Sequence, residues 1–211
     1  MRFLLIRFVS LLIFINTIFS PVLVYTHPLG NFSTNHFARI EVSTNQIKVR
    51  YVVDMAEITT FQELQKAGAK DANSPTEAEL NLYLEKIIPE YISKLTLTVN
   101  DKQINLEARE KTISTALGAG ELKTLRVECY LTGQIPSSTG LTYKVHFQDT
   151  NHPDRLGWHE MVVTSESGAS IFNSTAFGSA VTDEIKAYPE DALVAPLNER
   201  SADFYFTFAS R

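Results

Sequence analysis

Apolar and polar residues alternate at every second position in several stretches of this chain, and this period constrains the fold more than any other feature. The clearest stretch places four apolar side chains at alternate positions: Ile47, Val49, Tyr51 and Val53. Because successive side chains of a β-strand point to opposite faces, a period of two predicts strands with one buried face. Ser43-Thr44-Asn45 has a turn composition, so the chain from Ile40 to Asp54 is predicted to form a hairpin.

A second hairpin is predicted around Asn100-Asp101-Lys102, because Asn and Asp tolerate positive φ in turns. It joins residues 95–99 to residues 103–106. Further alternating or apolar runs bring the predicted number of strands to about nine: 122–133, 141–149, 158–165, 169–177 and 203–209. The predicted fold class is therefore mainly β (α+β), with antiparallel sheets arranged as a β-sandwich or meander.

A long helix is predicted to begin at the sequence Ser74-Pro75-Thr76-Glu77. With Ser74 as the N-cap, proline takes the first helical position and Glu77 the third, which is the pattern of a capping box. Apolar side chains then recur at the spacing of one helix face: Leu80, Tyr83, Leu84, Ile87, Ile88 and Tyr91. Pro89 is expected to kink or end the helix nearby, because it lacks the backbone donor that the helix needs.

A shorter helix is predicted from Ile58 to Ala67, with Phe61 and Leu64 facing inward and Gly68 ending it. Both helices are expected to pack against the sheets. The sequence has no internal repeat and no low-complexity tract, so one domain is predicted after the leader.

Residues 1–26 have the layout of a secretory signal peptide. Two arginines precede the apolar stretch from Phe8 to Phe19, and Thr26 occupies the position before a cleavage site at His27. Cleavage there leaves 27–211 as an exported domain, placed in the periplasm or at the outer face of the cytoplasmic membrane. The alternative is an uncleaved N-terminal anchor, because the leader is close to the shortest length that spans a bilayer.

The composition argues against nucleic acid as a partner and against an intramolecular disulfide. The chain has 19 Lys and Arg against 24 Asp and Glu, a net charge of −5, and its basic residues form no cluster. Nucleic acid is therefore not a predicted partner, since binding to phosphates relies on a basic face. Cys129 is the only cysteine, so no intramolecular disulfide forms, and its apolar surroundings in the sequence predict a buried, inert thiol.

Three residues are predicted as metal ligands: His27, Asp54 and Glu57. A mature chain that begins with His27 offers both its α-amine and its imidazole to one ion. Asp54 and Glu57 lie three residues apart where a strand gives way to a helix. Their carboxylates either complete an oxygen and nitrogen site with His27 or cap the helix that begins near Ile58.

The remaining sequence signals favour structural roles. His36, His146 and His159 fall in predicted strands and are expected at the surface or hydrogen-bonded in the core, and His152 need not face His159. Trp158, beside a glycine that allows close approach, is expected to anchor the core. No zinc-protease motif, nucleophile elbow or phosphate-binding loop is present, so no catalytic or cofactor-binding residue is predicted.

Three motifs, in order, give the chain a family resemblance: His27-Pro28-Leu29-Gly30-Asn31-Phe32-Ser33-Thr34-Asn35, then Arg50-Tyr51-Val52-Val53-Asp54-Met55-Ala56-Glu57-Ile58 with Thr60-Phe61-Gln62-Glu63, then Arg155, Gly157-Trp158 and Glu160. Over most of 27–200 the chain resembles the extracytoplasmic N-terminal domain of high-affinity nickel/cobalt transporters of the NicO type. In that family a multi-helix membrane transporter follows the domain. The resemblance implies weakly bound Ni(II) or Co(II), and transporter helices or a transporter subunit as partner.

Transport itself needs several membrane spans, so the chain is expected to be either a truncated transporter or a free-standing exported domain. The predicted function is non-enzymatic participation in nickel or cobalt transport. One alternative is a metal-independent envelope adaptor that contacts a partner through its surface. Another is a copper enzyme in which His27 forms half of a histidine brace, which needs a second histidine beside the N-terminus.

Overall fold

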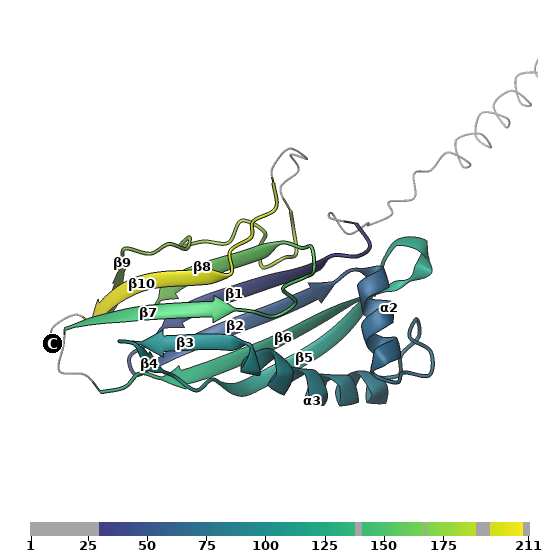
Figure 1. Ribbon diagram of the computed structural model, residues 1–211, viewed down its shortest axis with the longest axis horizontal. Coiled ribbons are helices and arrows are strands. Elements are labelled where there is room, and N and C mark those ends of the chain that lie inside the picture. The colour runs from purple at the N-terminus through teal and green to yellow at the C-terminus, as the bar shows by residue number, and fades with distance from the viewer. Residues whose placement is uncertain (1–29, 138–140, 167, 189–194, 209–211) are drawn as a thin grey trace, which may run out of the picture.

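The computed structural model describes residues 30–137, 141–166, 168–188 and 195–208. In this part of the chain, ten strands form two five-stranded sheets that face each other (Figure 1). The first sheet has the order β5 (Glu107–Leu117), β6 (Lys123–Gln134), β2 (Gln46–Met55), β1 (Thr34–Val42), β8 (His159–Ser165). The second has the order β4 (Lys102–Gln103), β3 (Leu95–Val99), β7 (Thr142–Asp149), β10 (Ser201–Phe208), β9 (Ala169–Phe172). The predicted mainly β fold is confirmed; the predicted leader and His27 lie outside the described residues.

Both predicted hairpins are present. β1 pairs antiparallel with β2 through the turn at 43–45. β3 pairs with β4 through Asn100 and Asp101, whose φ values of 50° and 61° lie in the left-handed region. One pairing departs from the antiparallel arrangement that we predicted, because β1 runs parallel to β8. Parallel neighbours need a long crossover, and here 116 residues separate the end of β1 from the start of β8.

The strand β5 is absent from the sequence prediction. It lies at the edge of the first sheet and is exposed along most of its length. An edge strand with little burial has no need of an apolar face, so its sequence lacks the alternation that identifies the other strands.

The long helix α3 covers Glu77–Ser93, and its cap is not the one predicted. Thr76 is the N-cap and forms a capping box with Glu79, so the assignment of Ser74 and Glu77 to those positions was wrong by two residues. Both frames place a hydroxyl three residues before a glutamate. The observed frame gains a further bond, because the Glu79 carboxylate also accepts the Lys70 N–H at 2.9 Å.

The remaining helix predictions are largely confirmed. Five of the six face residues of α3 are buried, and the helix continues past Pro89 for one further turn. The short helix α2 covers Glu57–Lys66 and buries Leu64 as predicted. Phe61 is 36% exposed, so its predicted inward orientation was wrong. The buried residues of α2 are Glu57, Thr59, Thr60 and Leu64, and Phe61 lies at the margin of the face that Glu57 and Leu64 share.

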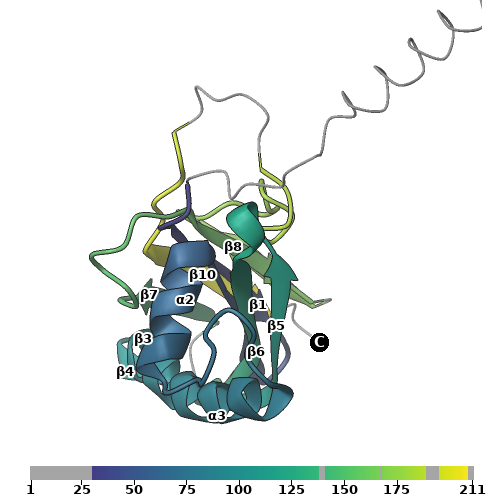
Figure 2. The same ribbon diagram turned by 90° about the vertical axis from the view of Figure 1, so that its right-hand side faces the viewer.

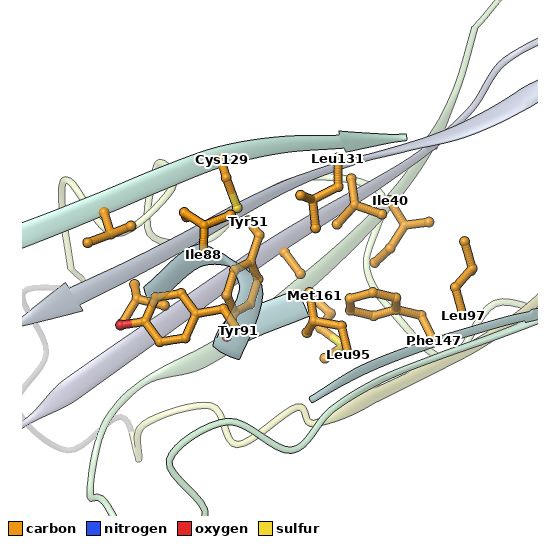
Figure 3. Packing of buried hydrophobic residues seen from close by; sticks show 14 of the residues in the cluster. Ile40, Tyr51, Ile88, Tyr91, Leu95, Leu97, Cys129, Leu131, Phe147 and Met161 are labelled. Carbon is orange, nitrogen blue, oxygen red and sulfur yellow. The ribbon is translucent and has the colours of Figure 1, made fainter. Parts of the chain in front are cut away.

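The main core fills the space between the two sheets and α3. Figure 3 shows Tyr51 and Cys129 of the first sheet packed with Tyr91 of α3 and Phe147 of the second sheet. Cys129 is buried, as predicted, and burial raises the pKa of its thiol to about 12. Trp158 is also buried, as predicted.

The two helices lie at one end of the sandwich (Figures 1 and 2). A smaller apolar cluster lies on the opposite face of the first sheet, where Ile185 covers Phe37, Val52 and Val162. Within the described ranges, no helix has both the length and the apolar character to cross a membrane.

Candidate functional site: a buried histidine cluster

Two histidines from distant strands lie side by side in the core. His36 of β1 is directly paired with His159 of β8. Their neighbours at alternate positions, Ala38 and Met161, belong to the main core, so the alternation of a strand directs both imidazoles inward. The two rings stack with their centroids 4.5 Å apart, and the side chains are 3% and 2% exposed. The sequence prediction gave these histidines separate structural roles, whereas the parallel pairing brings them together.

Asp149, the last residue of β7, orients His36. The Asp149 Oδ2 atom lies 2.8 Å from the His36 Nδ1 atom and accepts a hydrogen bond from the Tyr51 hydroxyl at 2.8 Å. The other carboxylate oxygen accepts from the backbone N–H and the side-chain amide of Asn151. An ionised carboxylate can only accept, so His36 donates to Asp149 from its Nδ1 atom.

The same contacts keep Asp149 ionised. Burial by itself would raise the pKa of Asp149, but the hydrogen bonds from His36, Asn151 and Tyr51 outweigh it and hold the pKa below its ordinary value. A buried negative charge therefore lies behind the His36 ring, and it favours any positive charge on the far side of that ring.

His152 supplies the third imidazole. Its Nδ1 atom forms a 3.2 Å hydrogen bond with the Nε2 atom of His36, and its ring contacts the Tyr91 ring edge-on at 5.6 Å. The backbone of His152 has φ 45°, a left-handed conformation that is uncommon among residues other than glycine and occurs here in the turn after β7. Burial, together with the nearby His36, lowers the pKa of His152 to about 3, so this ring is neutral at physiological pH.

The ring of His159 is also neutral. Neither of its ring nitrogens has a hydrogen-bond partner among the described residues. Burial, followed by His36 and Arg200, lowers the pKa of His159 to about 3, although the Gly157 carbonyl acts in the opposite direction. A buried imidazole without partners loses the hydrogen bonds that it makes to water in the unfolded chain, which favours a ligand at this position.

A cleft of about 450 Å³ opens from the surface to His159. Two guanidinium groups, Arg155 and Arg200, lie in its walls. The other residues that line it are Pro153, Leu156, Gly157, Pro196 and Asn198. The cleft therefore reaches His159, whereas His36 and His152 are not among its lining residues.

The structure places two of the three predicted metal ligands elsewhere. Asp54 lies 3.6 Å from Arg126 on β6, and burial, opposed by Arg126, raises its pKa to about 6. Glu57 is fully buried at the start of α2, where it accepts the Ala119 N–H at 2.6 Å. Each carboxylate thus has a partner within the protein. His27 lies outside the described residues, so a site formed by all three stays a prediction.

The histidine cluster could not be predicted from the sequence, because no short-range spacing of histidines indicates it. His36 and His159 meet through a parallel pairing between strands distant in sequence, and His152 joins them from a loop. Within the described ranges, no three His, Cys, Asp or Glu side chains are already arranged to hold a metal ion. The His36 Nε2 and His152 Nδ1 atoms form a hydrogen bond 3.2 Å long.

Comparison with known proteins adds no assignment: no family model matches the chain, and no curated protein matches it either.

Proposed function

We propose that this chain is a non-enzymatic extracytoplasmic domain that binds nickel or cobalt in support of their transport across a membrane. The observation that supports this proposal is the 3.2 Å separation between the His36 Nε2 and His152 Nδ1 atoms, in a cluster that also contains His159. Two imidazole nitrogens bound tetrahedrally to one ion at the usual metal–nitrogen distance are separated by about 3.3 Å. The separation, which in this structure is that of a hydrogen bond between the two rings, is thus compatible with a shared metal ion.

The surroundings of the pair suit a divalent cation. Burial already holds His152 in the neutral form that ligates metals, so no proton has to be removed from it near neutral pH. The Asp149 carboxylate contacts the His36 Nδ1 atom, on the other side of the ring from Nε2, as in the carboxylate–histidine–metal arrangement common in metalloproteins. Imidazole nitrogen is a good ligand for borderline ions such as Ni(II) and Co(II). The domain supplies no catalytic group in this proposal and acts by binding.

The sequence supports the proposed location and partner of the domain. Cleavage after Thr26 places the domain outside the cytoplasm, and the partner is a set of membrane transporter helices, joined covalently or as a subunit. A truncated transporter and a free-standing domain both fit this role. The metal-independent adaptor is the alternative that remains if no metal binds.

The proposal is tested by titrating the full chain with Co(II), whose visible absorption reports nitrogen ligation, and with Ni(II) by calorimetry. The informative variant is His152→Asn, because Asn tolerates positive φ and so preserves the turn. His146→Asn is the matched control, because His146 is a strand histidine on β7 paired with Asp203 at the surface. We expect His152→Asn to weaken binding at least about tenfold, as losing even a group behind a ligand does.

Two further outcomes are decisive, one for the location of the site and one for the metal proposal itself. Loss of binding in Asp54→Asn, with wild-type affinity in His152→Asn, assigns the metal to the predicted site of His27, Asp54 and Glu57. Absence of Co(II) and Ni(II) binding by the wild-type chain contradicts the metal proposal and leaves the adaptor.

A further inference from the structure

Two arginines in the cleft beside His159 differ from the other arginines that the structure describes. The others each pair with a carboxylate: Arg39, Arg50, Arg109 and Arg126. Arg155 and Arg200 form no ion pair within the described residues. Arg155 reaches only the amide oxygen of Gln62, at 3.5 Å, and Arg200 donates to the Asn151 carbonyl and the Asn198 side chain. A guanidinium has five N–H donors, so both groups keep donors for a ligand.

Backbone hydrogen bonds hold the segments that carry these two arginines. The His159 N–H donates to the Leu197 carbonyl at 2.8 Å, and the His159 carbonyl accepts from the Glu199 N–H at 3.0 Å. These two bonds fix the residues just before Arg200 against the start of β8. The Arg155 N–H is bonded within the turn after β7, at 3.2 Å. Both guanidinium groups therefore project from backbone that is bonded to the fold.

The lining of the cleft suits an organic anion. No acidic residue is among the described residues that line it, although the chain as a whole is acidic. Pro153, Leu156 and Pro196 provide apolar walls. The volume of about 450 Å³ lies within the range of roughly 300–1,000 Å³ that is usual for small-molecule sites. An organic molecule matches this space better than a bare inorganic ion does.

His159 adds a buried polar group to the lining. Its side chain is 2% exposed, and its ring nitrogens lack a hydrogen-bond partner of ordinary geometry among the described residues, although the Gly157 carbonyl acts on the ring. A neutral imidazole has one N–H group, which can donate to a carboxylate oxygen. A ligand in the cleft would thus give His159 the partner that buried polar groups usually have.

We infer that the cleft binds a small organic dicarboxylate. The planar fork of each guanidinium matches one carboxylate through two parallel hydrogen bonds. A ligand with two carboxylates pairs with Arg155 and Arg200 together, and a short hydrocarbon skeleton between them contacts the apolar walls. The inference goes beyond the proposed function and is independent of it, because this site needs neither a metal ion nor the pair of His36 and His152.

The inference is tested by equilibrium dialysis of the full chain with labelled succinate, in metal-free Tris chloride of low ionic strength. We expect one succinate to be retained per chain, with a Kd of about 1 mM or tighter. Butyrate has the same carbon skeleton with a single carboxylate, so it should bind at least about tenfold more weakly. Inorganic phosphate should compete as weakly as butyrate, because it leaves the apolar walls without a contact.

Arg155→Gln is the informative variant, because the one contact of this guanidinium within the described residues is the long one to Gln62. It should reduce the affinity for succinate to that for butyrate, with an unchanged circular dichroism spectrum. Arg109→Gln is the matched control, because Arg109 is an exposed arginine on β5 that pairs with Glu107, and it should bind succinate as the wild type does.

Three results would overturn the inference. The first is the absence of succinate binding by the wild-type chain. The second is wild-type affinity for succinate in Arg155→Gln. The third is equal affinity for succinate and for butyrate or phosphate, which would show a general anion site. All of these measurements are made without nickel or cobalt, so none of their outcomes changes the standing of the metal proposal.

Discussion

Replacing Gly157 with alanine should destabilise the fold severely, because this glycine lies directly against the backbone of β1. A β-carbon at position 157 would lie 1.8 Å from the Thr34 carbonyl oxygen and 2.5 Å from its carbonyl carbon. Real contacts of this kind lie beyond 3 Å, so the two segments must separate by more than 1 Å. The atoms in the way belong to the backbone and cannot rotate aside.

The cost follows from the hydrogen bonds that hold the two segments together. The Thr34 N–H donates to the Leu156 carbonyl at 2.9 Å, and the His36 N–H donates to the Trp158 carbonyl at 2.7 Å. The Trp158 N–H donates to the Asn35 side chain at 2.8 Å. Each bond contributes about 1 kcal/mol, and a buried group left without a partner costs a further 1–3 kcal/mol or so. We therefore expect Gly157→Ala to lower the free energy of unfolding by about 3 kcal/mol or more.

Urea unfolding followed by circular dichroism measures this loss. Gly178→Ala is the control, because an added β-carbon there meets nothing within 4 Å, and its stability should stay within about 0.5 kcal/mol of wild type. A loss below about 1 kcal/mol for Gly157→Ala, with the folded state intact, would refute the reasoning. It would mean that β1 and residues 156–158 separate without breaking the bonds between them.

Two further predictions concern the helix cap and a buried carboxylate. Thr76→Ala should lower the free energy of unfolding by about 1 kcal/mol, whereas Ser74→Ala should have little effect, and paired urea melts compare them; equal losses would argue against the observed capping frame. Asp54 has a pKa of about 6, above its value in an unfolded chain, so the contribution of Asp54 to stability should rise as the pH falls from 7 towards 4, while the lowered pKa values of His152 and His159 act in the opposite direction. Asp54→Asn should be more stable than wild type at pH 7 by about 3 kcal/mol, an advantage that disappears below pH 4; melts at several pH values that show parallel curves for the two proteins would contradict this.

The sequence determined the elements whose burial follows a simple period. The strands around Tyr51 and the apolar face of α3 were predictable because each buries one side against the core. The edge strand β5 was not, since exposure removes the pattern. The cap of α3 was misplaced because Ser74 and Thr76 both satisfy the local rule, and only the contact between Glu79 and Lys70 distinguishes them.

The candidate site was much harder to predict than the fold. Its residues come from β1, from the turn after β7 and from β8, and each is unremarkable in its own sequence neighbourhood. Asp149 and His36 meet across the two sheets, so their contact depends on how the sheets pack. Local patterns specify which face of a strand is buried, but they do not specify which distant strand lies beside it.

The parallel pairing of β1 with β8 has a consequence for the order in which the protein is assembled. The β1–β2 hairpin and α3 rest on contacts close in sequence, whereas the contact between His36 and His159 closes a loop of more than one hundred residues. Contacts of such long range form late, because the entropy of closing the loop must be overcome before they contribute. A chain that has emerged only as far as residue 120 can already contain the hairpin and the long helix, yet it holds a single histidine of the cluster. The cluster is therefore completed only when the C-terminal third of the chain docks on the N-terminal strands.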